Sequence, residues 1–272
     1  MITSLTLLIL SLVALYIGAG WLVQGSSALA LKAKISPLVV GLTIVAFGTS
    51  APELVVSLNA TLSGQGDIAI GNIVGSNIFN IGVILGVSAT ICPLQVKKQL
   101  LRIEIPVMLA TTVLFTILFW NGTLGRTEGL FFLTGIIIYT IFSLFYSRKH
   151  GTEGSSQELE EQPKHWAVDT LAIVGGLVVL VFASRLLVDN AVSIAKELGV
   201  SEAVIGLTIV AAGTSMPELA TSIVAAYKRK TDIAIGNIVG SNLFNILTIA
   251  GSCALIHLSL IHISEPTRLQ LI

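Results

Sequence analysis

Apolar segments long enough to cross a lipid bilayer follow one another along almost the whole chain. A transmembrane helix needs about 20 predominantly apolar residues. We predict such spans at residues 3–23, 37–62, 68–91, 104–120, 128–146, 167–188, 203–227 and 233–256. Only 11% of the 272 residues are charged, whereas soluble domains usually carry about 25%. The sequence therefore predicts an all-α, polytopic membrane protein.

The loops between these spans differ in charge, and the difference predicts the orientation of the chain. The longest loop, residues 147–166, is polar and acidic, and we interpret it as a solvated linker. This linker and every second loop together hold eleven Lys and Arg residues, against three in the remaining loops. Because cytoplasmic loops carry the excess of basic residues, we expect the linker in the cytoplasm and the N-terminus outside. The formal net charge of zero gives no indication of a nucleic-acid partner.

The chain contains an internal repeat. Residues 41–54 read GLTIVAFGTSAPEL and residues 206–219 read GLTIVAAGTSMPEL, with twelve of fourteen positions identical. Residues 66–81, GDIAIGNIVGSNIFNI, and 231–246, TDIAIGNIVGSNLFNI, match at fourteen of sixteen positions. Both pairs are offset by 165 residues, which indicates an ancestral duplication. The copies begin on predicted spans two and seven, and this odd separation inverts the second copy, as in many secondary transporters.

Each copy places a glutamate inside an apolar span, directly after a proline. Glu53 and Glu218 would cost about 2.5–3.5 kcal/mol each to insert as charges, so we expect them to face a polar cavity and bind a cation. A protonated carboxyl hydrogen-bonded to a neighbouring helix is the alternative. Pro52 and Pro217 each remove a backbone donor, which predicts an interrupted helix that lines a cavity.

Polar side chains gather on the helix face of each glutamate. A threonine and a serine precede the glutamate by four and three residues, and the next span carries serine and asparagine at spacings of four. The candidate metal-binding residues are Glu53, Glu218, Thr49, Thr214, Ser50, Ser215, Ser76, Ser241, Asn80 and Asn245. They offer oxygen ligands alone, which favour hard cations over zinc or copper. The glycine pairs Gly71–Gly75 and Gly236–Gly240 predict close helix packing.

The two motif pairs resemble the alpha repeats of the sodium/calcium exchanger superfamily, most closely those of prokaryotic calcium/sodium antiporters. The resemblance covers residues 1–256. It implies ten helices in two inverted halves of five, with Na⁺ and Ca²⁺ bound alternately at one central site and exchanged by alternating access. It implies no cofactor, since the two ions are the substrates.

The resemblance also implies a role for each candidate residue. Glu53 and Glu218 would bind both ions, and the two threonines would bind Ca²⁺ through their backbone carbonyls. The four serines would complete outer Na⁺ sites, and Asn80 would be a polar neighbour. Asn245 stands where some relatives have Asp, which leaves two site carboxylates. Two negative charges balance one Ca²⁺ but not three Na⁺, so the resemblance does not imply a 3:1 stoichiometry.

The resemblance divides the chain into four parts. These are a first repeat of five spans (1–146), the linker (147–166), a second, inverted repeat of three spans (167–257) and an atypical tail (258–272). The second repeat would need two further spans, for which the tail is too short. The tail is similar to a translated sequencing-adapter sequence, so we expect an artefactual tail and an incomplete second repeat.

Other functions are open at this stage. Coupling to H⁺ or K⁺ is the nearest alternative, because a carboxylate can exchange a proton for a cation. A cation channel would conduct without an opposing gradient. An intramembrane hydrolase would need a nucleophile with a general base, and no His or Lys accompanies Ser50 within its span. We expect a transporter in a bacterial inner membrane and not an enzyme.

Overall fold

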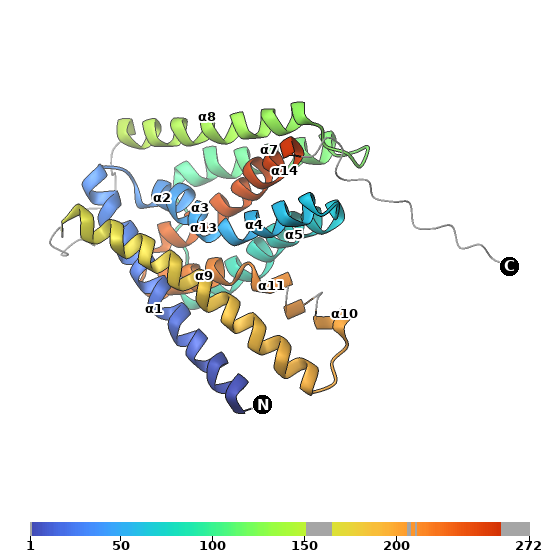
Figure 1. Ribbon diagram of the computed structural model, residues 1–272. Coiled ribbons are helices and arrows are strands. Elements are labelled where there is room, and N and C mark those ends of the chain that lie inside the picture. The colour runs from blue at the N-terminus through green and yellow to red at the C-terminus, as the bar shows by residue number, and fades with distance from the viewer. Residues whose placement is uncertain (1, 151–164, 206–207, 210, 257–272) are drawn as a thin grey trace.

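The computed structural model describes residues 2–150, 165–205, 208–209 and 211–256, and the regular structure in these ranges is helical throughout. Two long helices, α1 (Ile2–Ala33) and α9 (Trp166–Glu197), pack along each other on one side of the molecule (Figure 1). Helix α8 (Arg126–His150) lies on the opposite side. The repeated segments lie between these two walls, which places both copies at the centre of the fold.

The first repeated motif forms a broken helix. Its parts are α2 (Pro37–Val40), the π-helical turn η1 (Gly41–Val45), α3 (Ala46–Thr49) and α4 (Ala51–Leu62). The axis bends by 46° between Thr49 and Ala51. Pro52 lies in the first turn of α4, where a missing N–H removes no helical hydrogen bond. The predicted interruption at the proline is confirmed.

The second copy breaks in the same way. Helix α12 (Met216–Tyr227) has Pro217 in its first turn. It follows two short helices, α10 (Glu202–Ile205) and α11 (Ala211–Gly213). Both copies therefore start a new helix just before their glutamate.

The second motif of each copy forms a helix with a π-helical turn in it. In the first copy the parts are α5 (Gly66–Phe79), η2 (Asn80–Ile84) and α6 (Leu85–Ile91). In the second copy they are α13 (Thr231–Phe244), η5 (Asn245–Ala250) and α14 (Gly251–Ile256). Each π-helical turn starts at a candidate asparagine, and such turns are frequent at functional sites. The remaining elements are η3 (Leu100–Glu104) and α7 (Ile105–Leu118).

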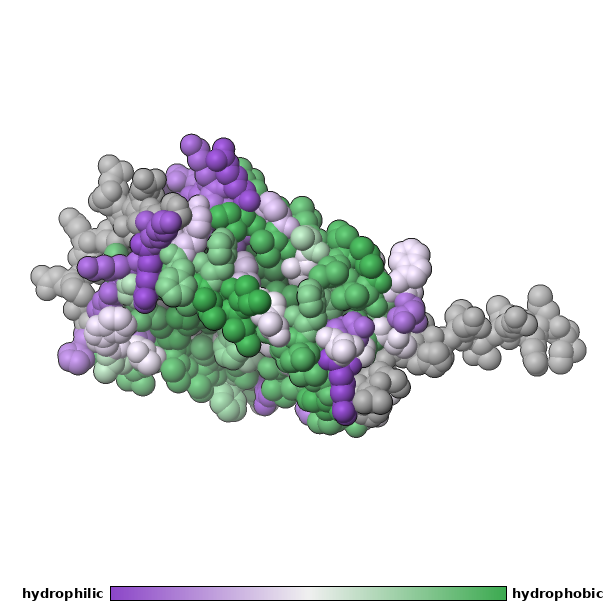
Figure 2. All heavy atoms as spheres, turned by 90° about the horizontal axis from the view of Figure 1, so that it is seen from above, coloured by the Kyte–Doolittle hydropathy of each residue, from purple (hydrophilic) through white to green (hydrophobic). Residues whose placement is uncertain are grey.

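The described helices match the predicted membrane spans closely. Six of them are long and apolar enough to cross a membrane, and the bent helix at 37–62 adds a seventh. The predicted span 203–227 includes residues outside the described ranges, so the total of eight stays a prediction. In Figure 2, hydrophobic residues cover the middle of the visible face and hydrophilic residues gather toward its margins. The tail at 258–272 and most of the linker lie outside the described residues.

Helices α1 and α9 are longer than predicted. We expected spans ending at residues 23 and 188, but the helices continue to Ala33 and Glu197. Buried Ser26 and Ser27 lie on the extension of α1, so a polar stretch continues as helix because it packs against protein. Lys32 on this extension forms an ion pair with Asp169 of α9 and lies 5.9 Å from the ring centre of Trp166. Hydropathy alone cannot predict such an extension.

We expect the loss of one partner of the Lys32–Asp169 pair to lower the stability of the protein more than the replacement of both partners. The side chains are only 10% and 5% exposed, so Asp169→Asn removes a carboxylate that pairs with a nearly buried ammonium. Breaking such a pair costs about 3 kcal/mol or more, whereas replacing both partners with apolar residues is often neutral. Urea unfolding of the purified protein in detergent should therefore show a larger loss for Asp169→Asn than for Lys32→Met with Asp169→Leu. Equal losses would contradict this interpretation.

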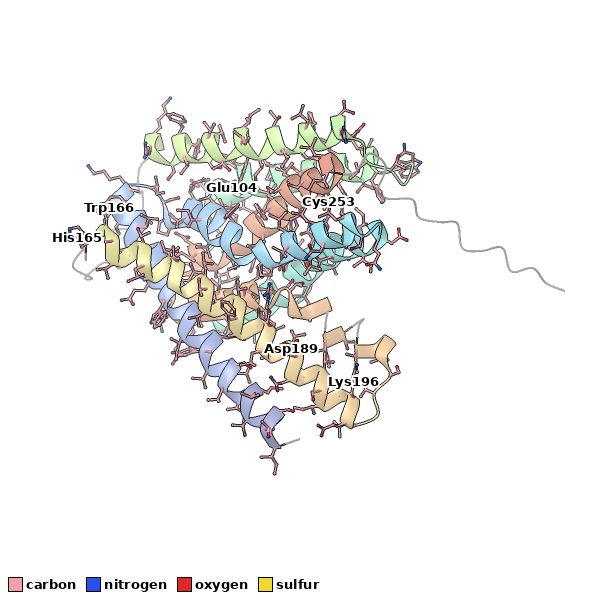
Figure 3. All side chains as sticks on the ribbon, in the orientation of Figure 1. Glu104, His165, Trp166, Asp189, Lys196 and Cys253 are labelled. Atoms are coloured by element: carbon pink, nitrogen blue, oxygen red, sulfur yellow. The ribbon has the colours of Figure 1, made fainter. Side chains whose placement is uncertain are left out.

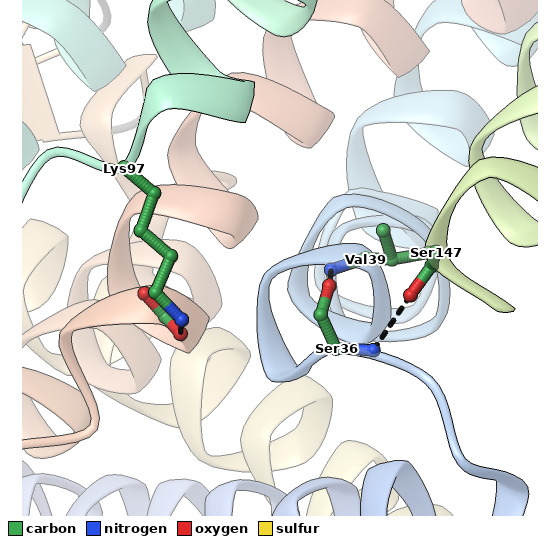
Figure 4. A network of polar contacts seen from close by, with 5 residues as sticks. Ser36, Val39, Lys97 and Ser147 are labelled. Carbon is green, nitrogen blue, oxygen red and sulfur yellow. Dashed lines mark hydrogen bonds and ion pairs between the residues drawn. The ribbon is translucent and has the colours of Figure 1, made fainter. Parts of the chain in front are cut away.

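Two further polar contacts join distant segments (Figure 4). Lys97 Nζ, just before η3, lies 2.5 Å from Asp232 Oδ2 in the first turn of α13. The Ser36 N–H donates to Ser147 Oγ of α8 at 2.7 Å, and Ser36 Oγ accepts from the Val39 N–H. These contacts join α13 to the segment before η3, and the start of α2 to α8.

The glycine pairs meet different surroundings in the two copies. At Gly236 and Gly240 an added Cβ would lie 2.4–2.5 Å from backbone oxygens of α2 and η1, so the predicted close packing is confirmed there. At Gly71 and Gly75 a Cβ would meet nothing within 4 Å among the described residues. For this first pair the packing prediction stays untested, because part of the second copy lies outside the described residues.

Candidate cation-binding site

Glu53 and Glu218 lie deep inside the molecule, each in the first turn of a helix that begins at a break. Each of the two glutamates is 1% exposed, and each belongs to an otherwise apolar span. The helix before each break, α3 or α11, ends with carbonyl groups that have no helical partner. Each break therefore brings a carboxylate and free backbone oxygens to the same depth, and both can bind a cation.

Each glutamate accepts a hydrogen bond from the serine of the other copy. Ser50 Oγ donates to Glu218 Oε1 at 2.7 Å, and Ser215 Oγ donates to Glu53 Oε1 at 3.0 Å. Ser215 Oγ also lies 3.2 Å from Ser76 Oγ of α5. The two breaks therefore face each other, and their carboxylates belong to one polar centre.

The threonines are held across the repeat in the same reciprocal manner. Thr49 Oγ1 donates to Asn237 Oδ1 at 3.0 Å, and Thr214 Oγ1 donates to Asn72 Oδ1 at 3.3 Å. The amide of Asn72 in turn donates to the Glu53 backbone oxygen at 3.2 Å. Asn237 donates to the Glu218 backbone oxygen at 3.4 Å. These contacts fix both threonine hydroxyls and both glutamate backbone oxygens between the two copies.

A third pair of links lies one helical turn beyond Ser76 and Ser241. Asn80 Nδ2 donates to Asn242 Oδ1 at 3.0 Å, and Asn245 Nδ2 donates to Asn77 Oδ1 at 3.0 Å. Each link joins α5–η2 of one copy to α13–η5 of the other. The asparagine side chains thus add a third reciprocal pair of contacts between the two copies.

Several buried oxygens in this centre have no hydrogen-bond partner among the described residues. They are Glu53 Oε2, Glu218 Oε2, Asn80 Oδ1, Asn245 Oδ1 and Ser241 Oγ. A buried polar atom without a partner costs about 1–3 kcal/mol. The first four are pure acceptors in these states, and they form two pairs related by the repeat offset. Oxygens of this kind can accept hydrogen bonds or bind a cation.

The structure brings the ten predicted site residues together at the contact between the two copies. Nine of them take part in the cross-repeat hydrogen bonds described above, and Ser241 is fully buried on α13 with a free oxygen. No group of three His, Cys, Asp or Glu side chains occurs in the part of the chain that the structure describes. The centre therefore has two carboxylates, and its other polar side chains are neutral.

Four connecting asparagines were not among the predicted site residues. They are Asn72, Asn237, Asn77 and Asn242, and each makes a polar contact to the opposite copy. The available signal was their recurrence at the offset of 165 residues, on or beside the face that carries the predicted serines and asparagines. The geometry shows which of these repeated polar residues join the two copies.

Comparison with known proteins gives consistent matches over nearly the whole chain. The family described as sodium/calcium exchanger protein matches residues 3–145 and 168–271. Inner membrane protein YrbG of Escherichia coli is 39% identical over 262 residues, covering 94% of this chain and 81% of the relative. The Ca²⁺/H⁺ antiporter ChaA of Bacillus subtilis is 29% identical over 238 residues, with coverage of 81% and 68%.

The fold is also similar to that of a solved sodium-calcium exchanger. A structure of the sodium-calcium exchanger NCX_Mj, soaked with Na⁺ and Ca²⁺, superposes with a TM-score of 0.82 at 33% sequence identity. The alignment covers 96% of this chain and 84% of that one. The likeness therefore extends over the whole described arrangement of helices.

Proposed function

This chain belongs to the sodium/calcium exchanger family, and we propose that it exchanges Ca²⁺ for Na⁺ by alternating access at the oxygen-lined centre between its two repeats. Family membership makes it an integral membrane cation exchanger rather than an enzyme. The choice of ions, the transport mechanism and the roles of individual residues are the content of the proposal.

One observation carries the proposal: two buried carboxylates belong to one centre together with unpartnered amide oxygens. Within the described part of the chain, Glu53 and Glu218 each keep one oxygen without a hydrogen-bond partner, as do Asn80 and Asn245. The two negative charges can be neutralised by one Ca²⁺ or by two monovalent ions. Oxygen ligands of this kind suit both Ca²⁺ and Na⁺. Because both copies contribute to each contact, a movement of one repeat against the other would change access to the centre.

The direct test is uptake of labelled Ca²⁺ into vesicles that contain the purified chain. Uptake should begin when Na⁺ is trapped inside at high concentration and should stop when the Na⁺ gradient is removed. Vesicles without protein give the background. Uptake that persists without any opposing gradient would indicate a channel and would contradict exchange.

Proton coupling is the second candidate, because a relative of this chain is a Ca²⁺/H⁺ antiporter. The same vesicles separate the candidates when the trapped ion is Na⁺, K⁺ or H⁺ in turn, with the other two balanced across the membrane. We expect Ca²⁺ uptake in the Na⁺ arm. Uptake only in the arm with an acidic interior would replace Na⁺ by H⁺ in the proposal.

The loop charges support a topology in which the N-terminus lies outside and the linker lies in the cytoplasm. The site residues proposed as ion ligands are the ten predicted from the repeat. The repeats at 1–146 and 167–257 would then be the two moving halves, with a bacterial inner membrane as the location.

A further inference from the structure

The amide oxygens of Asn80 and Asn245 are useful to a cation only if they point the right way. A carboxamide has a donor end, the NH₂ group, and an acceptor end, the oxygen. Asn80 and Asn245 are each 1% exposed, and in both the oxygen is the end that has no partner among the residues the structure describes. The groups that hold the two NH₂ ends therefore decide whether an oxygen or an NH₂ group is left free.

Asn242 holds the NH₂ end of Asn80, and its own orientation follows from a neighbouring sulfur. Asn80 Nδ2 donates to Asn242 Oδ1 at 3.0 Å, while Asn242 Nδ2 lies 3.7 Å from Met108 Sδ of α7. A thioether sulfur can accept a hydrogen bond but cannot donate one. This contact favours the orientation in which the NH₂ group of Asn242 faces Met108 and its oxygen faces Asn80.

Asn77 holds the NH₂ end of Asn245 by the same logic. Asn77 Nδ2 donates to the backbone oxygen of Asn242 at 3.4 Å. A backbone carbonyl is also an acceptor only, so the oxygen of Asn77 is left for Asn245, whose Nδ2 lies 3.0 Å away. The amide orientation of all four asparagines is thus fixed by two groups that cannot donate.

We propose that Asn242 and Asn77 are positioning residues that turn the side-chain oxygens of Asn80 and Asn245 toward the transported cation. This inference rests on the proposed function and extends it to residues outside the predicted ligand set. Each positioning residue belongs to the repeat opposite to the ligand that it orients. If Asn80 or Asn245 rotated by half a turn, an NH₂ group would face the cation and repel it.

Asn242→Leu is the first test, with Ca²⁺ as the probe. Loss of a group that orients a ligand typically lowers metal affinity about 10–100-fold. We expect a loss of this size in two readouts, the Ca²⁺ concentration for half-maximal uptake and the concentration that protects the purified protein from thermal unfolding. The maximal uptake rate should change much less.

The Asn80→Asp background distinguishes orientation from general support. An aspartate has two acceptor oxygens, so it needs no amide orientation. In this background, Asn242→Leu should lower the apparent Ca²⁺ affinity by no more than about twofold, which is the usual limit for independent effects. If Asn242 merely supported the structure, Asn242→Leu would lower the apparent Ca²⁺ affinity equally in the wild-type and Asn80→Asp proteins. That result would overturn the proposal.

The second link provides a matched control. Asn77→Leu should remain costly in the Asn80→Asp background and should lose its effect in the Asn245→Asp background. If Asn242→Leu does not fold, Asn242→Asp keeps its shape and its acceptor for Asn80, and should keep wild-type affinity or exceed it. A folded Asn242→Asp protein with a tenfold lower affinity would refute the proposal. Absence of Ca²⁺ binding and uptake in the wild-type chain would instead refute the proposed function itself.

Discussion

Replacing either central glutamate with glutamine is expected to lower Na⁺-dependent Ca²⁺ uptake about 100-fold or more. Glu53→Gln and Glu218→Gln keep the size of the side chain and an oxygen that can accept from the opposite serine. They remove one of the two negative charges of the centre. Affinity at calcium sites depends on the number of charged ligands, and even changes to groups behind the ligands cost about 10–100-fold. Vesicle uptake over a range of Ca²⁺ concentrations measures the loss.

Glu104→Gln is the matched control for this experiment. Glu104 is also buried in an apolar span (Figure 3), with 0% exposure. Both of its oxygens are engaged, one by Tyr139 Oη at 2.5 Å and the other by Gln99 Nε2 at 2.8 Å. We expect this variant to keep most of its uptake. If it failed as completely as the central variants while remaining folded, the loss would not be specific to the proposed site.

The central site could be predicted from the sequence because the same polar residues recur in both copies of the duplicated segment. A proline followed by a glutamate inside an apolar span indicates both a helix break and a costly charge. The structure confirms the break at Ser50 and brings Glu53 and Glu218 into one centre through reciprocal serine contacts. What the sequence could not give is the pairing itself, since a repeat does not say which polar side chains meet across it.

The orientation of the asparagine amides is the feature of the site that the sequence predicts least. The orientation of Asn242 depends on Met108, which is 134 residues away in the chain and belongs to no repeated motif. Spacing on a helix predicts which residues share a face. It does not predict which end of an amide faces inward, because that depends on whether the neighbour can donate.

Helix packing around the second repeated motif could not be predicted from the sequence either. The segments 66–81 and 231–246 are almost identical, so local preferences predict the same environment for both. In the most apolar window of Thr231–Ile256, 94% of the residues are buried, against 28% for Gly66–Ile91. Burial depends on which other helices lie alongside, and α2, η1 and α3 cover α13. Identical sequence therefore has different consequences in the two copies.

This difference predicts opposite effects for one substitution made at two equivalent glycines. At Gly240, an added Cβ would lie 2.4 Å from the Leu42 backbone oxygen and 2.7 Å from the Ala46 Cβ. Gly240→Ala should therefore force the α13–η1 contact apart and destabilise the protein by about 1–3 kcal/mol or more. At Gly75, where an added Cβ meets nothing within 4 Å among the described residues, alanine should be neutral or stabilise the helix by about 0.5–1 kcal/mol.

The two variants control for each other, since both place alanine in the same GNIVGSN context. Thermal and urea unfolding of both proteins in the same detergent would give the two shifts. The expected result is a clear loss for Gly240→Ala and none for Gly75→Ala. Equal losses would mean that α5 is as closely packed as α13 in the protein under study. The exposed face of α5 would then have to be covered in solution, and the asymmetry between the two copies would not hold.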